Sequence, residues 1–169
     1  MRPAASYWID KLQLTAHVEG GAFREFYRSD LVFPKSVLPL FFQGPRAAST
    51  SIYFLLADGQ FSAFHRIASD ELWHFYFGDS LLIYEIGHNG RMIEHRLGLD
   101  IANGESFQAV VRAGSWFASV PAPGSEYALV GCTVAPGFDF ADFELAERNA
   151  LVAQYPEHAE IIRKLTRQA

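Results

Sequence analysis

Short strand-like runs separated by turn signals occupy residues 50–135, and this spacing most constrains the fold available to the chain. The turn signals are Asp58-Gly59, Gly78-Asp79, His88-Asn89-Gly90, Asn103-Gly104, Ala113-Gly114 and residues 121–124. Many short strands with turns at such intervals are typical of an antiparallel β-sandwich or barrel. The sequence therefore predicts an all-β core.

The segment before this core predicts a helix, a strand and a loop. Residues 4–12 place Trp8 and Leu12 at helical spacing, which predicts a short helix. Residues 22–29 alternate between two faces, as a strand does. Residues 30–48 contain three prolines and a glycine, which favours a surface loop.

The segment after the core predicts two helices. One is expected to begin near Ala141, with Asp139 as its cap, and the second at Pro156. A length of 169 residues favours one domain and allows a real hydrophobic core. We expect a single domain over residues 1–169, with a barrel core at about 17–137.

Composition excludes several classes of protein. Half of the residues are hydrophobic and 15% are aromatic, which is too apolar for disorder. No apolar run approaches the roughly 20 residues that a membrane span needs, and Asp10 and Lys11 interrupt any signal peptide. The net charge of −5 and the lack of a basic cluster argue against nucleic acid. The single cysteine, Cys132, fits a reducing compartment, so we expect a cytoplasmic protein.

One motif contains residue types that can bind a metal or transfer a proton. His65 and Glu71 lie between Gly59 and Gly78 with five residues between Gly59 and His65, five between His65 and Glu71, and six between Glu71 and Gly78. With Ile67 in the place of a second histidine, this spacing resembles the first signature of the cupin superfamily. The counterpart of the second cupin signature is GESFQAVVRAGSWFASV, at residues 104–120.

The wider chain resembles one small cupin family without an agreed function. The matching stretches are HVEGGAFREFYRS, STSIYFLLADGQFSAFHRIASDELWHFYFGD, GESFQAVVRAGSW and LVGCTVAPGFDFADFELA. The resemblance implies a double-stranded β-helix (jelly-roll) barrel of the RmlC type, with a pocket at one mouth. It also implies a homodimer, and a second barrel would cover the sheet edges.

The metal positions of the cupin signatures are changed. Metal cupins use two histidines and a glutamate of the first signature and a histidine of the second. Here Ile67 and Phe117 replace two of the four, and only His65 and Glu71 remain. His74 lies on the other face of the predicted strand from Glu71 and would need a bulge to join it. We therefore expect no cofactor. The alternative is a metal-dependent dioxygenase or decarboxylase that uses His65 and Glu71, with His74 or a water completing the metal shell.

Without a metal, His65 and Glu71 are candidate catalytic residues. A histidine beside a carboxylate in a low dielectric has a tunable pKa and can act as an acid or base. Metal-free cupin epimerases, which the fold resembles, abstract protons with an inward histidine. The expected ligand is a small polar metabolite, such as a sugar or nucleotide-sugar. Alternatively, His65 and Glu71 only satisfy each other's hydrogen-bonding groups and charge inside the barrel, and the protein is a non-catalytic binding protein.

Further residues are candidates for ligand binding. Aromatic and apolar walls are expected from Ile67, Trp73, Phe75 and Phe117. HVEGGAFREFYRS is expected at the pocket mouth, where Gly20 and Gly21 would let the backbone approach a ligand. A guanidinium there would bind a carboxylate or phosphate, although surface ion pairs are the alternative, particularly for Arg28. The remaining ligand-binding candidates are Arg24, Glu25, Tyr53 and Gln108. Cys132 is predicted to be a small buried hydrophobe.

Overall fold

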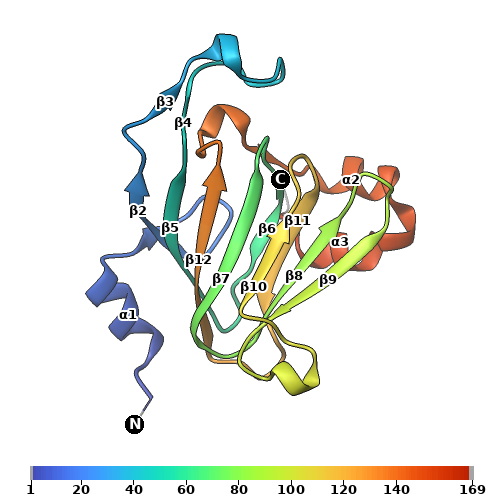
Figure 1. Cartoon of the computed structure of the whole chain (residues 1–169). Helices are drawn as coiled ribbons and strands as arrows, with labels where there is room; N and C mark the ends of the chain where they lie inside the picture. Colours follow the sequence, from blue (N-terminus) through green and yellow to red (C-terminus); the bar gives the residue numbers. More distant parts are fainter. Residues whose placement is uncertain (1, 168–169) are drawn as a thin grey trace.

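The computed structural model describes residues 2–167 and consists mainly of two antiparallel sheets packed face to face (Figure 1). The six-stranded sheet has the order β1 (Thr15–Ala16), β2 (Ala22–Arg28), β5 (Thr50–Ala57), β12 (Tyr127–Ala135), β7 (Asp70–Gly78), β10 (Gln108–Val111). The five-stranded sheet has the order β13 (Glu144–Leu145), β6 (Ser62–Arg66), β11 (Trp116–Pro121), β8 (Leu81–Ile86), β9 (Met92–Leu97). The predicted all-β architecture is confirmed.

Strand β7 shows why these residues form a sandwich. Glu71, Trp73 and Phe75 are buried, whereas Leu72 and Tyr76 between and beyond them are exposed. Successive side chains of a strand point to opposite faces, so this alternation aims one face at the second sheet. The sequence prediction for the two faces of β7 is confirmed.

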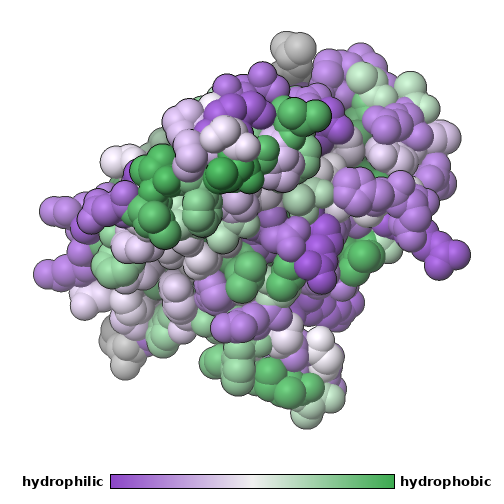
Figure 2. Space-filling view, turned by 45° about the horizontal axis from the view of Figure 1, so that its top comes forward, coloured by the Kyte–Doolittle hydropathy of each residue, from purple (hydrophilic) through white to green (hydrophobic). Residues whose placement is uncertain are grey.

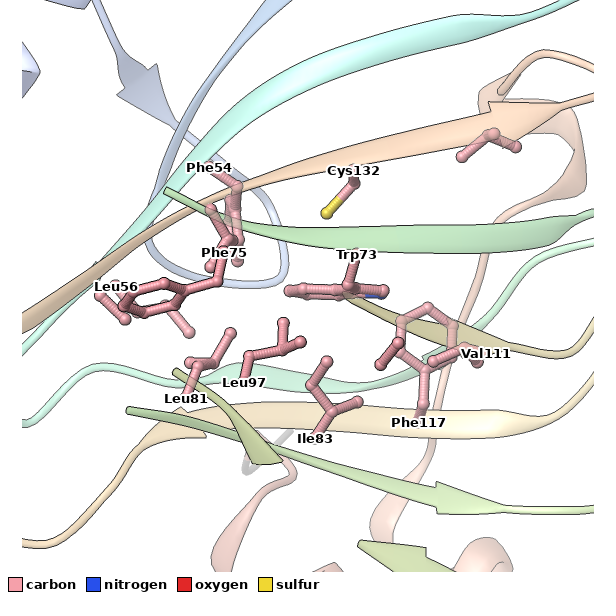
Figure 3. Close-up of a cluster of buried hydrophobic side chains, with 14 of the residues drawn as sticks. Phe54, Leu56, Trp73, Phe75, Leu81, Ile83, Leu97, Val111, Phe117 and Cys132 are labelled. Carbon is pink, nitrogen blue, oxygen red and sulfur yellow. The ribbon is translucent and has the colours of Figure 1, made fainter. Parts of the chain in front are cut away.

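The space between the sheets is filled by a continuous hydrophobic core (Figure 3). Trp73 of the six-stranded sheet and Phe117 of the five-stranded sheet meet edge to face, with ring centroids 6.3 Å apart. Apolar residues such as Leu81, Ile83 and Leu97 close the lower part in the figure and have no exposed surface. Such dry packing supplies most of the stability of a domain of this size and holds the strands rigidly.

Helices cover the outside of both sheets. Helix α1 (Ala5–Leu12) confirms the predicted N-terminal helix and lies against the six-stranded sheet, where Trp8 Nε1 donates to the Tyr127 hydroxyl at 3.0 Å. Helices α2 (Arg148–Gln154) and α3 (Ala159–Lys164) pack on the five-stranded sheet. No helix among residues 2–167 has the length and apolar character needed to cross a membrane. The short 3-10 helices are η1 (Lys35–Val37), η2 (Ile101–Asn103), η3 (Phe140–Asp142) and η4 (Pro156–His158).

The predicted helix start near Ala141 is wrong. Asp139 does act as a cap, but of η3, where its Oδ1 accepts from the Ala141 N–H at 2.8 Å. The chain then pairs with β6 as strand β13, so α2 begins only at Arg148, with Glu147 accepting from two backbone N–H groups at its start. Sheet pairing here overrides a helical sequence pattern, because it satisfies the backbone against an open edge.

The predicted surface loop at residues 30–48 contains a two-stranded sheet, β3 (Val32–Phe33) with β4 (Arg46–Ala47). At its base Arg46 donates from Nε to Asp142 Oδ2 at 2.6 Å, and both side chains are buried. Its tip is exposed, with Leu40 at 93%. In the space-filling view, hydrophobic residues appear on the surface in clusters separated by hydrophilic ones (Figure 2).

Candidate functional site

A cavity of ≈ 270 Å³ opens between the two sheets at one end of the sandwich. Its inner part is polar, although most of its walls are apolar or aromatic. It combines residues of β2, β5, β6, β7 and β12 with the turn before β2 and the segment after β12. The lining residues are His17, Glu19, Phe23, Glu25, Arg28, Thr50, Ile52, His65, Ile67, Glu71, Cys132, Val134, Phe138, Asp139 and Phe140.

The fold brings the two predicted catalytic residues to this cavity from opposite sheets. His65 is in β6 of the five-stranded sheet, and Glu71 is in β7 of the six-stranded sheet. Their exposed fractions are only 3% and 7%. Both sheets turn these side chains inward. His65 and Glu71, which are six positions apart in the sequence, are therefore neighbouring ionisable groups in a low dielectric.

Hydrogen bonds determine where the protons of His65 reside. Its Nδ1 lies 2.7 Å from the carbonyl oxygen of Ala63, which only accepts, so Nδ1 carries a proton. Its Nε2 lies 3.0 Å from Glu19 Oε2. A proton on either partner makes this close contact favourable: the pair is then a protonated Glu19 with a neutral imidazole, or a carboxylate with an imidazolium.

Glu19 is the central residue that the sequence did not identify as a partner of His65. It lies in the turn between β1 and β2, 7% exposed, with its carboxyl group inside the barrel. Burial raises its pKa to about 7, against the opposing charge of His17. Burial likewise lowers the pKa of His65. Both directions favour the neutral pair, in which Glu19 is protonated and the imidazole of His65 is uncharged.

Glu71 is the second buried carboxyl group. Burial raises its pKa to about 7; nearby His65 lowers this pKa, whereas Glu19 raises it. The thiol of Cys132 lies beside it, and burial together with the Glu71 charge holds that thiol in its protonated form by raising its pKa. Cys132 is buried as predicted and also forms part of the cavity wall. A carboxyl group with a pKa near 7 is matched to acid–base chemistry at neutral pH.

His17 is a second imidazole on the same cavity. The backbone N–H of Glu19 donates to His17 Nδ1 at 3.3 Å, so this nitrogen accepts and the proton of the neutral ring is on Nε2. Burial lowers the pKa of His17. The carboxyl group of Glu19 thus lies between two histidines, with Oε1 3.7 Å from His17 Nδ1.

The cavity mouth carries charge. Arg28 binds Glu25 with two hydrogen bonds, Nε to Oε1 at 3.0 Å and Nη2 to Oε2 at 2.7 Å, and its guanidinium also donates to the Phe138 carbonyl at 3.2 Å. Arg28 is therefore in the surface ion pair that the sequence favoured, and it also borders the cavity. Glu25 lines the cavity as predicted.

The predicted wall residues divide into two groups. Ile67 lines the cavity. Trp73, Phe75 and Phe117 are instead part of the core beneath it and do not line the cavity. Phe117 packs on the His65 ring with centroids 4.1 Å apart, so it fixes the imidazole rather than contacting a ligand.

Three predicted ligand-binding residues lie elsewhere. Arg24 is exposed and donates to the Leu12 carbonyl at 3.0 Å. Tyr53 lies on the outer face of the six-stranded sheet, and Gln108 is exposed on its edge strand β10. All three predictions of pocket position are wrong. The two faces of each of these strands have similar polarity, so the sequence pattern does not identify which face points into the barrel.

The glycine pair also has a different role from the one expected. Gly20 has φ +121°, and a Cβ there would collide with the Phe61 carbonyl; one on Gly21, at φ +73°, would lie 2.7 Å from the Leu55 carbonyl oxygen. The glycines let the turn approach the neighbouring backbone closely, and this close approach places Glu19 inside the barrel. They serve the position of Glu19 rather than the approach of a ligand.

These residues do not fit the metal centre of cupin enzymes. Ile67 and Phe117 put hydrocarbon where two histidine donors would be, and His65 Nε2 lies 3.0 Å from Glu19 Oε2. His74 points away, with Nε2 3.1 Å from Thr133 Oγ1. Within residues 2–167 no three His, Cys, Asp or Glu side chains are grouped as metal ligands.

Comparison with known proteins reveals close relatives. A crystal structure of protein SO0799 from Shewanella oneidensis is 43% identical, with a TM-score of 0.89 over 99% of both chains. A hypothetical protein from Leishmania major is 31% identical, with a TM-score of 0.90 over 98% of this chain and 100% of that one. The uncharacterized protein YML079W of Saccharomyces cerevisiae is 33% identical over 79% of this chain and 71% of its own.

A distant structural relative shares only the fold. Oxalate decarboxylase from Bacillus subtilis is 15% identical, with a TM-score of 0.55 over 89% of this chain and 36% of that one. The model of the family described as "Cupin superfamily (DUF985)" matches residues 6–146. The long match, the jelly-roll sandwich and the 33–43% identical relatives agree: this chain belongs to the cupin superfamily, in that family.

Proposed function

We propose that the cavity binds a small polar metabolite and that Glu71, with the Glu19–His65 pair, performs metal-free acid–base chemistry on it. The observation that carries the proposal is the 3.0 Å contact between Glu19 Oε2 and His65 Nε2, which lies beside a second buried carboxyl group, that of Glu71. Such a group can both take and return a proton near pH 7. Epimerisation or isomerisation through removal of a C–H proton is the reaction class that needs a group able to accept a proton and then return it.

The walls support an organic ligand. Phe23, Ile52 and Phe140 give apolar surface for a carbon skeleton, and buried polar groups converge in the interior of the cavity. Ligand pockets commonly measure roughly 300–1,000 Å³, and this cavity, at ≈ 270 Å³, suits one small ring such as a sugar. The nucleotide part of a nucleotide-sugar would have to extend through the mouth.

Within this proposal His65 acts through Glu19. Both ring nitrogens have protein partners, so the imidazole accepts or releases the shared proton while the carboxyl groups face the ligand. This refines the sequence prediction, which assigned proton transfer to His65 directly. Binding without turnover is the second candidate function. The polar groups of Glu19 and His65 are partners of each other even without a ligand, so their pairing does not require catalysis.

Deuterium incorporation tests the proposal. Monosaccharides and nucleotide-sugars are screened for binding by ligand-observed NMR, and the bound compounds are then incubated with protein in D₂O. We expect exchange at one C–H position with wild-type protein and its loss in Glu71→Gln. Glu126→Gln, an exposed carboxylate outside the cavity, is the control and keeps wild-type exchange. Binding without exchange would identify a binding protein instead.

We also propose that a second copy of the chain is a partner. The outer face of the six-stranded sheet exposes Phe26 at 64% and Tyr76 at 46%. Tyr53 lies between them, with centroids 5.4 Å from Phe26 and 5.9 Å from Tyr76. A contiguous aromatic row on the part of this face that α1 leaves exposed supports an interface between copies.

A further inference from the structure

Resting on the proposed function, we infer that His17 binds the ligand, as a neutral hydrogen-bond donor whose Nε2–H holds a carbonyl oxygen. The ligand class is then a carbonyl compound with a C–H on the neighbouring carbon, within reach of Glu71. The inference adds a residue outside the histidine–glutamate motif and narrows the substrate from any polar metabolite to an enolisable one.

The tautomer of His17 is fixed by the backbone. A backbone N–H only donates, so the 3.3 Å bond from Glu19 N leaves His17 Nδ1 as acceptor and places the ring proton on Nε2. Among residues 2–167 the fully enclosed side-chain N and O atoms without a partner belong to Ser62, Trp73, Ser115 and Ser119. His17 Nε2 is not one of them and has no hydrogen-bond partner within that part of the chain, so it keeps accessible surface, and His17 is one of the residues that line the cavity.

Aromatic rings hold the imidazole in place. Phe23 meets it edge-on with centroids 4.4 Å apart, and Phe140 stacks with centroids 6.3 Å apart and planes 21° from parallel. A donor must be held rigidly if it is to meet a developing charge without reorganisation. Two ring contacts and one backbone hydrogen bond supply that rigidity for His17.

The surroundings also keep His17 neutral. Its side chain is 8% exposed, and burial disfavours the imidazolium form; the nearby His65 adds to this, while Glu19 opposes it. The other ionisable groups of the cavity are Glu71 in the interior and Glu25, Arg28 and Asp139 at the mouth, where Arg28 is already bound to Glu25. A neutral imidazole N–H polarises a carbonyl without surrendering its proton.

The chemistry balances with these groups alone. The Glu71 carboxylate takes the proton from the carbon beside the carbonyl, and the electron pair of the broken C–H bond moves to the carbonyl oxygen as an enolate. His17 Nε2–H donates a hydrogen bond to that oxygen throughout. Return of the proton from Glu71 to carbon regenerates a carbonyl compound, and exchange of the Glu71 proton with D₂O labels it. Nothing is oxidised or reduced.

The test uses full-length protein, hydroxyacetone as the probe and two substitutions. His17→Phe keeps an aromatic ring between Phe23 and Phe140 but removes the donor, and His17→Gln offers an amide N–H close to the position of Nε2. Binding is measured by NMR titration, and thermal unfolding confirms that both variants fold. We expect His17→Phe to weaken binding by about three- to tenfold, the worth of one neutral hydrogen bond, and His17→Gln to restore it.

A second readout is independent of any ligand. In histidine-labelled ¹⁵N protein, the ring of His17 is expected to give the neutral Nε2–H pattern at pH 7. An imidazolium or Nδ1–H pattern would overturn the inference, as would unchanged hydroxyacetone binding in His17→Phe or no binding by wild-type protein. If His17→Phe loses binding but wild-type protein incorporates no deuterium into hydroxyacetone, the donor role stands and the proposed acid–base function fails.

Discussion

Glu19 Oε2 lies 3.0 Å from His65 Nε2, and this contact joins a turn outside the barrel strands to the central histidine of the cavity. Because His65 Nδ1 is bound to the Ala63 carbonyl, the imidazole is fixed on both sides. The partner of His65 in the structure is thus Glu19, while Glu71 lies nearby as a separate carboxyl group. The site therefore contains two carboxyl groups around one fixed ring.

The stability contributed by Glu19 and Glu71 should fall as the pH rises from about 4.5 to about 7. Burial raises the pKa of Glu19 and of Glu71 to about 7 in the folded state, above the ordinary value of 4.5, so the folded protein holds protons that the unfolded chain has released. The free energy of unfolding then declines by up to about 1.4 kcal/mol per pH unit for each group. Urea denaturation across this range should show that the slope of the unfolding free energy against pH is less negative in Glu19→Gln and Glu71→Gln than in wild-type protein.

Glu85 provides a matched control of opposite sign. It is also buried, and burial opposes ionisation, but hydrogen bonds from His95 and the Arg112 N–H lower its pKa overall. Glu85→Gln should destabilise the protein at pH 7, and the loss of stability should shrink as the pH falls through the lowered pKa of Glu85.

The same pH slope in wild-type and Glu71→Gln protein would contradict the assignment of Glu71 as a proton-holding group.

Gly20→Ala should destabilise the protein by about 2–4 kcal/mol, because a left-handed backbone strain and a collision with the Phe61 carbonyl add together. Gly59→Ala is the control: its φ of +73° carries the strain, but nothing lies within 4 Å of the added Cβ, so about 1 kcal/mol is expected. Chemical denaturation measures both. Equal losses would show that the close approach of this turn to the barrel is unimportant.

Restoring two histidines should create a metal site. In the double variant Ile67→His with Phe117→His, His65 and Glu71 gain the two donors that the cupin signature otherwise has, and binding of about one Co²⁺ or Zn²⁺ is expected by calorimetry. Wild-type protein purified without an affinity tag should contain far less than one metal ion by elemental analysis. A full equivalent of manganese, iron, nickel or zinc would instead establish the metal-dependent alternative.

The protein should be a dimer of twice 18.9 kDa in light scattering. Phe26→Asp should shift it toward monomer, because the charge would enter the aromatic row that Phe26 forms with Tyr53. Leu40→Asp, at a 93% exposed position on the tip of the 30–48 loop, should leave the mass unchanged. A monomeric mass for wild-type protein at micromolar concentration would refute the proposed interface.

The sequence predicted the part of the fold that local patterns encode. Alternation along β7 separated Glu71 from His74, and the prediction that His74 points outward is confirmed by its bond to Thr133. Turn spacing and the cupin signature together predicted the jelly roll. The prediction of a helix from Ala141 was wrong, because pairing of β13 with β6 satisfies backbone groups that a helix would also have satisfied.

For the site, the sequence by itself determined which chemical groups were available: His65 and Glu71 with hydrocarbon at the metal positions. Only the tertiary structure decided what they do together. Glu19 lies 46 positions before His65, so no local period links them, and the turn that delivers it depends on backbone contacts with Phe61 and Leu55. Burial of the assembled group then shifts both carboxyl pKa values to about 7, because desolvation exists only when the sheets have closed over the cavity.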